Sequence, residues 1–188
     1  MPLTLSGSGS ITGLSVGGLP DGSVDADTLA AGAAGGGKVN QIVQKTSDLG
    51  YDLSNTSTWT AVSSDLDLAI TTTTNSSKVL VQTFSQVFQD GNDWTAYFTF
   101  MRDSDSNNLG HSVHGLKCLY FTSGGFSTGD FIRPIHMSVL DTPGNAGTYT
   151  YKIFHKGDRS DSHWNQATGD ADQGRNARNV ILLTEILA

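Results

Sequence analysis

The fold class is decided by residues 79–88, which read VLVQTFSQVF. One side of this run carries Val79, Val81, Thr83, Ser85 and Val87, and the other carries Leu80, Gln82, Phe84, Gln86 and Phe88. Successive side chains of a β-strand point to opposite faces of a sheet, so this period of two predicts a strand over the whole run.

The same period of two recurs in six further runs along the chain. They cover residues 38–44, 66–71, 94–100, 131–140, 148–155 and 179–187. Clusters of Asn, Asp, Gly and Ser separate the runs, as expected for turns. Good helix formers are thin, and Glu occurs only at Glu185. Short strands at this spacing predict an all-β domain, an antiparallel β-sandwich or barrel, over residues 38–188.

The last run contains Val180-Ile181-Leu182-Leu183, which is apolar on both faces. A strand that faces water on one side alternates apolar and polar residues, and this one does not. The pattern predicts either a central strand or a strand whose second face is covered by another subunit.

The residues before the first run have a different composition. Residues 1–30 scatter a few apolar side chains among Gly, Ser and Thr, and residues 31–37 contain only Gly and Ala. Such a segment cannot build a core of its own, so it is expected to order only against a partner surface. We interpret 1–30 as a docking arm and 31–37 as a hinge. The candidate docking residues are Leu14, Val16, Leu19 and Leu29.

The composition of the chain argues against several classes of partner. The 188 residues carry a formal net charge of −7, which repels phosphate backbones, so nucleic acid is not an expected partner. No apolar run approaches the roughly 20 residues of a membrane helix, and no signal peptide is evident at the start. Cys118 is the single cysteine, so no intrachain disulfide is expected.

Three short motifs suggest ligand sites and fail on their spacing or context. Residues 32–39, GAAGGGKV, resemble a phosphate-binding loop but place Val39 where Ser or Thr is needed and lead into a strand. His111 and His114 lie near Cys118, but in a strand they would point to opposite faces. Residues 103–108 begin like a calcium loop but lack its Gly and its final acidic residue, which leaves only an irregular site open. No metal or cofactor is therefore predicted.

No constellation of residues indicates catalysis. The chain has no G-x-S-x-G motif, and a pair of carboxylates for glycoside cleavage would have to be two aspartates that no spacing selects. We therefore expect a protein that is not an enzyme. Arg159, His163 and Trp164 lie in a polar, loop-like stretch that suits sugar stacking or a protein interface. The alternative is that Trp164 begins a strand and packs inward.

A set of blocks along the chain carries a family resemblance. The blocks are 11–30 (ITGLSVGGLPDGSVDADTLA), 38–44 (KVNQIVQ), 77–81 (SKVLV), 138–144 (SVLDTPG) with 149–152 (YTYK), 169–172 (GDAD) and 181–188 (ILLTEILA). In this order they resemble phage tail-fibre-like virion proteins, especially those of marine and cyanobacterial phages. The departures from the family pattern fall between Asp90 and Phe131, where a variable tip or a particle-specific contact would lie.

The resemblance implies a homotrimer with jelly-roll-like knobs, located in the virion after synthesis in the bacterial cytoplasm. It implies a fibre or head-fibre subunit that docks by its arm to capsid or tail proteins and displays the knob toward the host surface, with a host glycan as a further partner. The alternative is a cement or decoration protein that stabilises the capsid shell. A glycan-degrading appendage enzyme is the alternative from another class, and the family offers no catalytic residues for it.

Overall fold

The computed structural model describes residues 38–89, 94–102, 107–121, 131–158, 162–165 and 178–187. The chain divides into two units between Gly36 and Gly37, and the second unit contains all of the described residues. The expected docking arm and hinge, with Leu14, Val16, Leu19 and Leu29, therefore lie outside the described residues.

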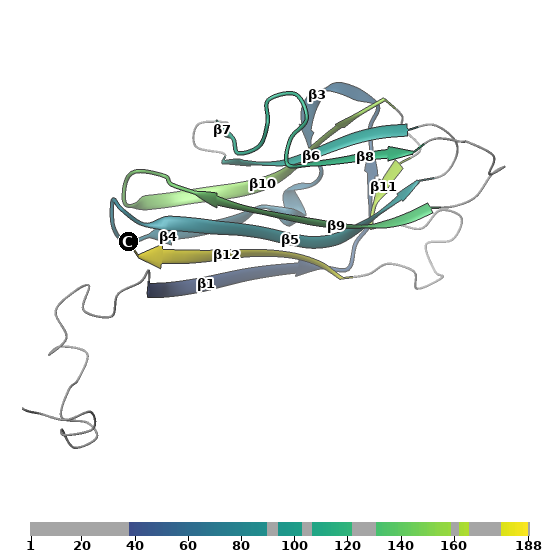
Figure 1. Ribbon diagram of the computed structural model, residues 1–188. Coiled ribbons are helices and arrows are strands. Elements are labelled where there is room, and N and C mark those ends of the chain that lie inside the picture. The colour runs from purple at the N-terminus through teal and green to yellow at the C-terminus, as the bar shows by residue number, and fades with distance from the viewer. Residues whose placement is uncertain are drawn as a thin grey trace, which may run out of the picture. The chain divides into compact units, whose positions relative to one another are not determined.

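The second unit is an all-β sandwich of two antiparallel sheets (Figure 1). Its elements are β1 (Lys38–Ser47), β2 (Tyr51–Leu53), β3 (Thr56–Ala61), the short 3-10 helix η1 (Ser64–Leu66), β4 (Leu68–Thr72), β5 (Lys78–Gln89), β6 (Trp94–Arg102), β7 (Asn107–Asn108), β8 (Lys117–Phe121), β9 (Phe131–Asp141), β10 (Gly147–Gly157), β11 (Ser162–Trp164) and β12 (Asn179–Leu187).

The strand order is that of a jelly roll. In the first sheet β1, β12, β5 and β9 lie side by side, and β11 with β2 continue beside the end of β5. In the second sheet β10 pairs with β6 on one side and with β3 and β4 on the other, while β8 pairs with β6. The orders β1-β12-β5-β9 and β4-β10-β6-β8 are those of a jelly roll, which is built from two Greek keys. The prediction of an all-β sandwich is confirmed.

The core is formed by the side chains that alternate inward from both sheets. From β5 and β12 these are Val79, Val81, Val87, Ile181 and Leu183; from β6 and β10 they are Ala96, Phe98, Phe100, Tyr151 and Ile153. Neighbouring inward residues on each of these strands lie two positions apart, since the buried Thr83 and Ser85 lie between Val81 and Val87, and this is the period that the sequence shows. Of the two alternatives for Val180–Leu183, the first is confirmed, because β1 and β5 flank β12 on both sides, while coverage of its outer face by another subunit stays a prediction.

A buried polar cluster of Asp141, Arg102 and Tyr151 links the two sheets. The carboxylate of Asp141 accepts hydrogen bonds from Arg102 Nη1 at 2.8 Å and from the Tyr151 hydroxyl at 2.7 Å. Burial raises the pKa of Tyr151, and the bond to Asp141 raises it further, so the hydroxyl stays protonated as a donor. Because Asp141 ends β9 and the other two residues lie in the second sheet, the cluster links the two layers.

Glu185 forms a second polar centre, which we call the Glu185 clasp. Its side chain is buried in β12, and its two oxygens accept bonds from Asn40 Nδ2 and Gln41 Nε2 at 2.7 Å, from the Thr73 amide at 2.7 Å and hydroxyl at 2.9 Å, and from the Ser77 hydroxyl at 2.7 Å. Burial by itself raises the pKa of Glu185. The hydrogen bonds from Asn40, Thr73, Gln41 and Ser77 together lower it by more, so the pKa falls to about 2. The clasp therefore joins β1, β12 and the β4–β5 turn around a carboxylate that stays ionised.

His155 makes the stability of the domain sensitive to pH. This side chain points into the core, and burial lowers its pKa from 6.5 to about 4. The unfolded chain takes up the proton first, so stability is expected to fall as the pH drops from 6.5 toward 4, by about 3 kcal/mol in all. Urea unfolding between pH 7 and about pH 5 measures the upper part of this loss, above the range in which carboxylates titrate. His155→Leu should remove this pH-dependent loss of stability. If the free energy of unfolding fell equally steeply with pH in both proteins, the assignment to His155 would be contradicted.

Candidate functional sites

The first candidate site is the outer face of the sheet formed by β1, β12, β5 and β9. The pairing of Ile42 with Thr184, Thr184 with Leu80 and Leu80 with Leu140 places one row of side chains across all four strands. Parallel rows on the same face add more apolar side chains. Apolar members of this face include Val39, Ile42, Val180, Leu182, Ile186, Leu80, Phe84, Phe88, Ile132 and Leu140.

Several of these side chains are open to solvent. Ile42 is 60% exposed, Leu140 50% and Phe84 40%. The Phe84 ring meets His136 of β9 edge-on, with ring centroids 5.2 Å apart. Four strands about 4.8 Å apart and eight residues of about 3.4 Å each span roughly 500 Å² in flat projection, which approaches the roughly 800 Å² that one partner buries in a standard interface.

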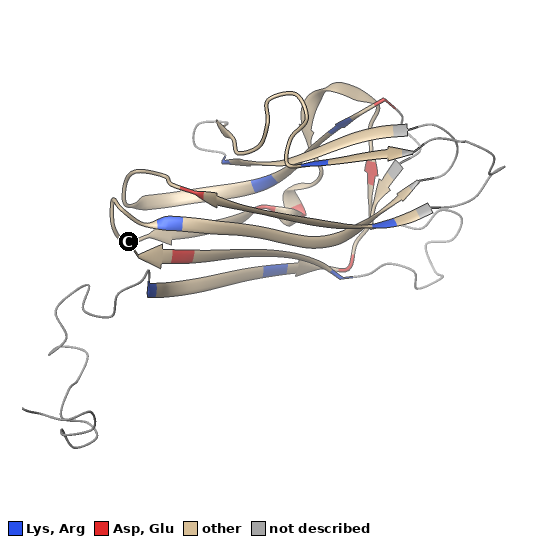
Figure 2. Cartoon of the chain, viewed as in Figure 1, with Lys and Arg blue, Asp and Glu red and all other residues tan. Residues whose placement is uncertain are grey.

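The same face is nearly free of charge. Lys and Arg, Asp and Glu are few along these four strands (Figure 2). Glu185 and Asp141 point inward, so among the described residues of the four strands the outer face carries Lys78 and no carboxylate. In a chain of net charge −7, this face thus lets two copies approach without described carboxylates of the four strands facing each other.

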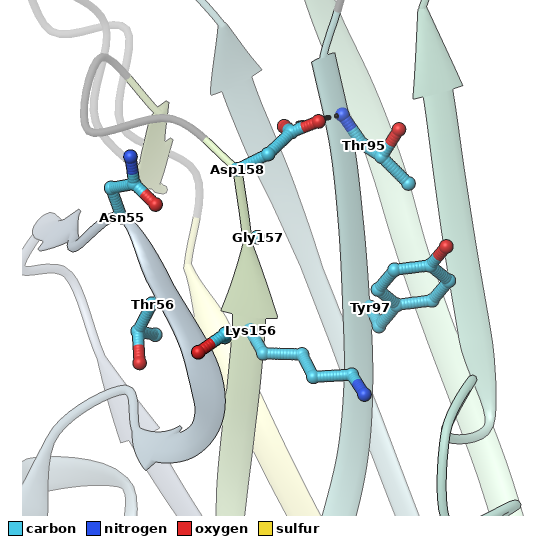
Figure 3. Close-up of a pocket in the computed structure, with 8 residues that line it drawn as sticks. Asn55, Thr56, Thr95, Tyr97, Lys156, Gly157 and Asp158 are labelled. Carbon is cyan, nitrogen blue, oxygen red and sulfur yellow. Dashed lines mark hydrogen bonds between the residues drawn. The ribbon is translucent and has the colours of Figure 1, made fainter.

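The second candidate site is a hollow of about 370 Å³ on the second sheet, drawn in Figure 3. Lys156, Gly157 and Asp158, at the end of β10, lie between Thr95 and Tyr97 of β6 on one side and the start of β3 on the other. The Asp158 carboxylate accepts a hydrogen bond from the Thr95 amide at 3.0 Å, which fixes one wall. The opposite wall is lined by Asn55, Thr56 and Ser57.

Aromatic rings hold the one ammonium group of this hollow. Lys156 Nζ lies 4.8 Å from the centre of the Trp59 ring and 5.4 Å from that of Tyr97. The Trp59 indole donates to the Ser112 carbonyl at 3.0 Å, so the segment after β7 keeps that ring in place. Within the described part of the chain no carboxylate lies in ion-pair distance of Lys156, so its charge is balanced only by ring faces.

The hollow lies at the end of the sandwich away from the point where the chain enters it. Lys38 begins β1 next to the Glu185 clasp, and Gly147 begins β10 opposite Thr72, close to the same clasp. Gly157 is the last residue of β10, so about ten residues of about 3.4 Å separate the two ends. The candidate ligand site and the entry of the chain are therefore roughly 34 Å apart along the strand.

The three predicted surface-ligand residues do not form a site in the described structure. Arg159 lies outside the described residues. Trp164 is 0% exposed and packs against Phe98, because β11 pairs with both β5 and β2 and turns this residue inward. His163 faces the other way and its Nδ1 lies 2.7 Å from Asp52 Oδ1. The prediction of a stacking platform at Trp164 is wrong, and the alternative of an inward-packed Trp164 describes the structure.

The histidine pair needs a second correction. His111 and His114 do not diverge as expected of a strand, because residues 111–115 form a turn in which the two rings stack with centroids 5.0 Å apart. His111 Nδ1 accepts the amides of Val113 and His114. The residues that the structure describes contain no group of three or more His, Cys, Asp or Glu side chains placed to hold a metal ion. The calcium-like stretch falls largely outside them.

Two further expectations bear on these sites. Val39 lies in β1, so the phosphate-loop-like stretch leads into a strand, as the sequence predicted. In the described ranges, no helix has the length and hydrophobicity to span a bilayer.

Comparisons with known proteins add little to this geometry. No protein-family model matches the chain, and no curated protein matches it. Among solved structures, one match is titled "Structure of infectious bursal disease virus Gx strain". It is 12% identical with a TM-score of 0.33, and the match covers 80% of this chain and 38% of that one. The chain thus spans less than half the length of the solved chain that it matches.

Proposed function

We propose that this chain is a structural subunit of a bacteriophage particle, a fibre or head-fibre protein that assembles into a homotrimer. The observation that carries the proposal is the apolar outer face of β1, β12, β5 and β9, whose size approaches that of one side of a standard interface and whose described residues include no outward carboxylate. A second copy of the chain is the occupant to which the proposal commits.

One further observation supports the proposal. The blocks that resemble phage tail-fibre-like proteins at 38–44, 77–81 and 181–188 belong to β1, β5 and β12, the strands that make this face. In the same proposal the arm, through Leu14, Val16, Leu19 and Leu29, attaches the subunit to other virion proteins, while the far end of the sandwich faces the host.

Breaking the proposed contact should leave single folded chains. Ile42→Asp and Leu140→Asp each place a carboxylate on the outer face, at its two edge strands, where both side chains are already at least half exposed. We expect the unaltered protein to sediment as three chains at micromolar concentration and each variant to sediment as one, because a buried unpaired charge opposes association.

The matched control is Val113→Asp. Val113 is 51% exposed, as apolar as Ile42, and lies in the turn beside the second sheet. This variant should remain a trimer with an unchanged melting temperature. A stable monomer for the unaltered chain, or dissociation by the control as readily as by Ile42→Asp, would overturn the proposed assembly.

Copy number separates the fibre proposal from the decoration alternative. A fibre subunit is present in one to a few dozen copies per particle, whereas a protein that clamps capsid subunits is present in hundreds. Quantitative mass spectrometry of purified particles gives this number directly. A count in the hundreds would replace the fibre with a shell-stabilising role and leave the trimer to be tested separately.

A further inference from the structure

We infer that the hollow between β3, β10 and β6 binds an acidic saccharide, a sugar ring that carries a carboxylate. The inference deepens the host contact of the proposed function and assigns it to Lys156, Tyr97, Asp158 and the segment 55–57. Lys156 and Asp158 begin the polar stretch that the sequence suggested for sugar stacking, but Tyr97 and the segment 55–57 were not predicted, because the hollow joins three distant segments.

The ammonium of Lys156 supplies the group that recognises a carboxylate. It is half-buried between the Trp59 and Tyr97 rings, which restricts its side chain before a ligand arrives. Since no described carboxylate pairs with it, a ligand carboxylate gains a charge-assisted hydrogen bond without breaking an existing ion pair.

The rest of the lining suits hydroxyl groups. Asp158 accepts one amide bond through Oδ1 and keeps further acceptor capacity for vicinal hydroxyls. Asn55, Thr56 and Ser57 add an amide and two hydroxyls on the opposite wall. The volume of about 370 Å³ lies at the lower end of the range for small-molecule sites, which fits one or two sugar rings.

The composition of the lining also disfavours two other ligands. A purely apolar ligand would cover the Lys156 ammonium and the remaining acceptor positions of Asp158 without offering a hydrogen bond to either. A highly charged polyanion would meet Asp158, which lies in the same hollow as the single cation. A ligand with one carboxylate and several hydroxyls satisfies both groups at once.

The experiment is an amide NMR titration of the full chain with sodium glucuronate, with glucose and sodium acetate as separate probes. We expect saturable shifts at Thr95, Tyr97 and residues 156–158 with glucuronate, and affinity at least about tenfold weaker for glucose and for acetate, since each supplies only half of the contacts. Lys156→Met keeps the side-chain stem against the rings and should weaken glucuronate binding about tenfold or more while leaving glucose unaffected.

Lys152→Met is the matched control, because Lys152 lies on the same face of β10 four residues away and contacts Asp67 instead of the hollow. It should bind glucuronate like the unaltered chain. The inference is overturned if glucuronate causes no saturable shifts, if acetate binds equally well, or if Lys156→Met has no effect in a protein with an unchanged melting temperature. Such a failure would leave the trimer standing, because sedimentation measures assembly independently of this hollow.

Discussion

Glu185→Ala is expected to destabilise the domain by about 3 to 5 kcal/mol, because it leaves several donors of the Glu185 clasp without an acceptor. The Ser77 hydroxyl is buried, and the Thr73 amide and hydroxyl both point at the missing Oε1. Water can replace only part of this set, since the site of the lost side chain is 0% exposed. Urea unfolding followed by circular dichroism measures the loss.

Glu185→Gln is the control that separates charge from shape. Its carbonyl can still accept from Thr73 and Ser77, but its amide would face the amide nitrogens of Asn40 and Gln41, so a smaller loss is expected. The carboxylate contributes stability above its ordinary pKa of 4.5, and this stability is lost as the pH falls through the folded value of about 2. The Gln variant should lack that part of the acid sensitivity. If Glu185→Ala and the unaltered chain had equal free energies of unfolding, the clasp would not contribute to the stability of the domain.

Trp164→Ala is the second change with a large expected effect, a loss of about 3 to 5 kcal/mol. The indole ring fills the core beside Phe98, with ring centroids 5.4 Å apart. Its Nε1 donates at 2.8 Å to Asn179 Oδ1, and Asn179 in turn donates to the Leu49 carbonyl at 2.9 Å. Removing the ring therefore opens a cavity and releases the contact between β11 and the start of β12.

Trp164→Phe keeps a six-membered aromatic ring in the core, loses the donor and leaves a smaller cavity than Ala does. Asn179 Oδ1 still accepts from Ser85, so we expect this variant to lose only about 1 to 2 kcal/mol. Trp59→Ala serves as a positional control, since Trp59 is only half-buried on the outer side of the second sheet. If Trp59→Ala destabilised the domain as much as Trp164→Ala, the assignment of Trp164 to the core would not hold.

The strong strands could be read from the sequence because their information is local. The runs at 79–88 and 131–140 alternate over their whole length, and they became β5 and β9 with ends shifted by one residue. β3 was missed because Thr56–Ala61 is a run of Thr and Ser around one Trp, with no apolar alternation. β8, at Lys117–Phe121, was not predicted because its exposed positions are occupied by Cys118 and Tyr120, so the run shows no alternation of apolar and polar residues.

The sites could not be read because their partners are distant in sequence. Glu185 accepts from Asn40 and Thr73, which lie 145 and 112 residues away. Trp164 turns inward because of the pairing of β11 with β2 and β5, and three residues of strand leave no period to detect. The hollow joins residues 55–57, 95–97 and 156–158, each of which reads as an ordinary polar strand end. Their proximity can be predicted only once the order of the strands in the sheet is known.

The antiparallel pairing of β1 with β12 has a mechanical consequence. The chain enters the sandwich at Lys38, and the hollow lies at the opposite end. In the proposed fibre, with the arm attached and a ligand in the hollow, tension would run along the strands. Pulled in this direction, the nine register pairs from Lys38–Leu187 to Ser47–Asn179 carry the load together as shear and do not open one at a time. The Glu185 clasp adds hydrogen bonds from β1 and from the β4–β5 turn to β12 at the end where the chain enters, so it would oppose the separation of β1 from β12 there.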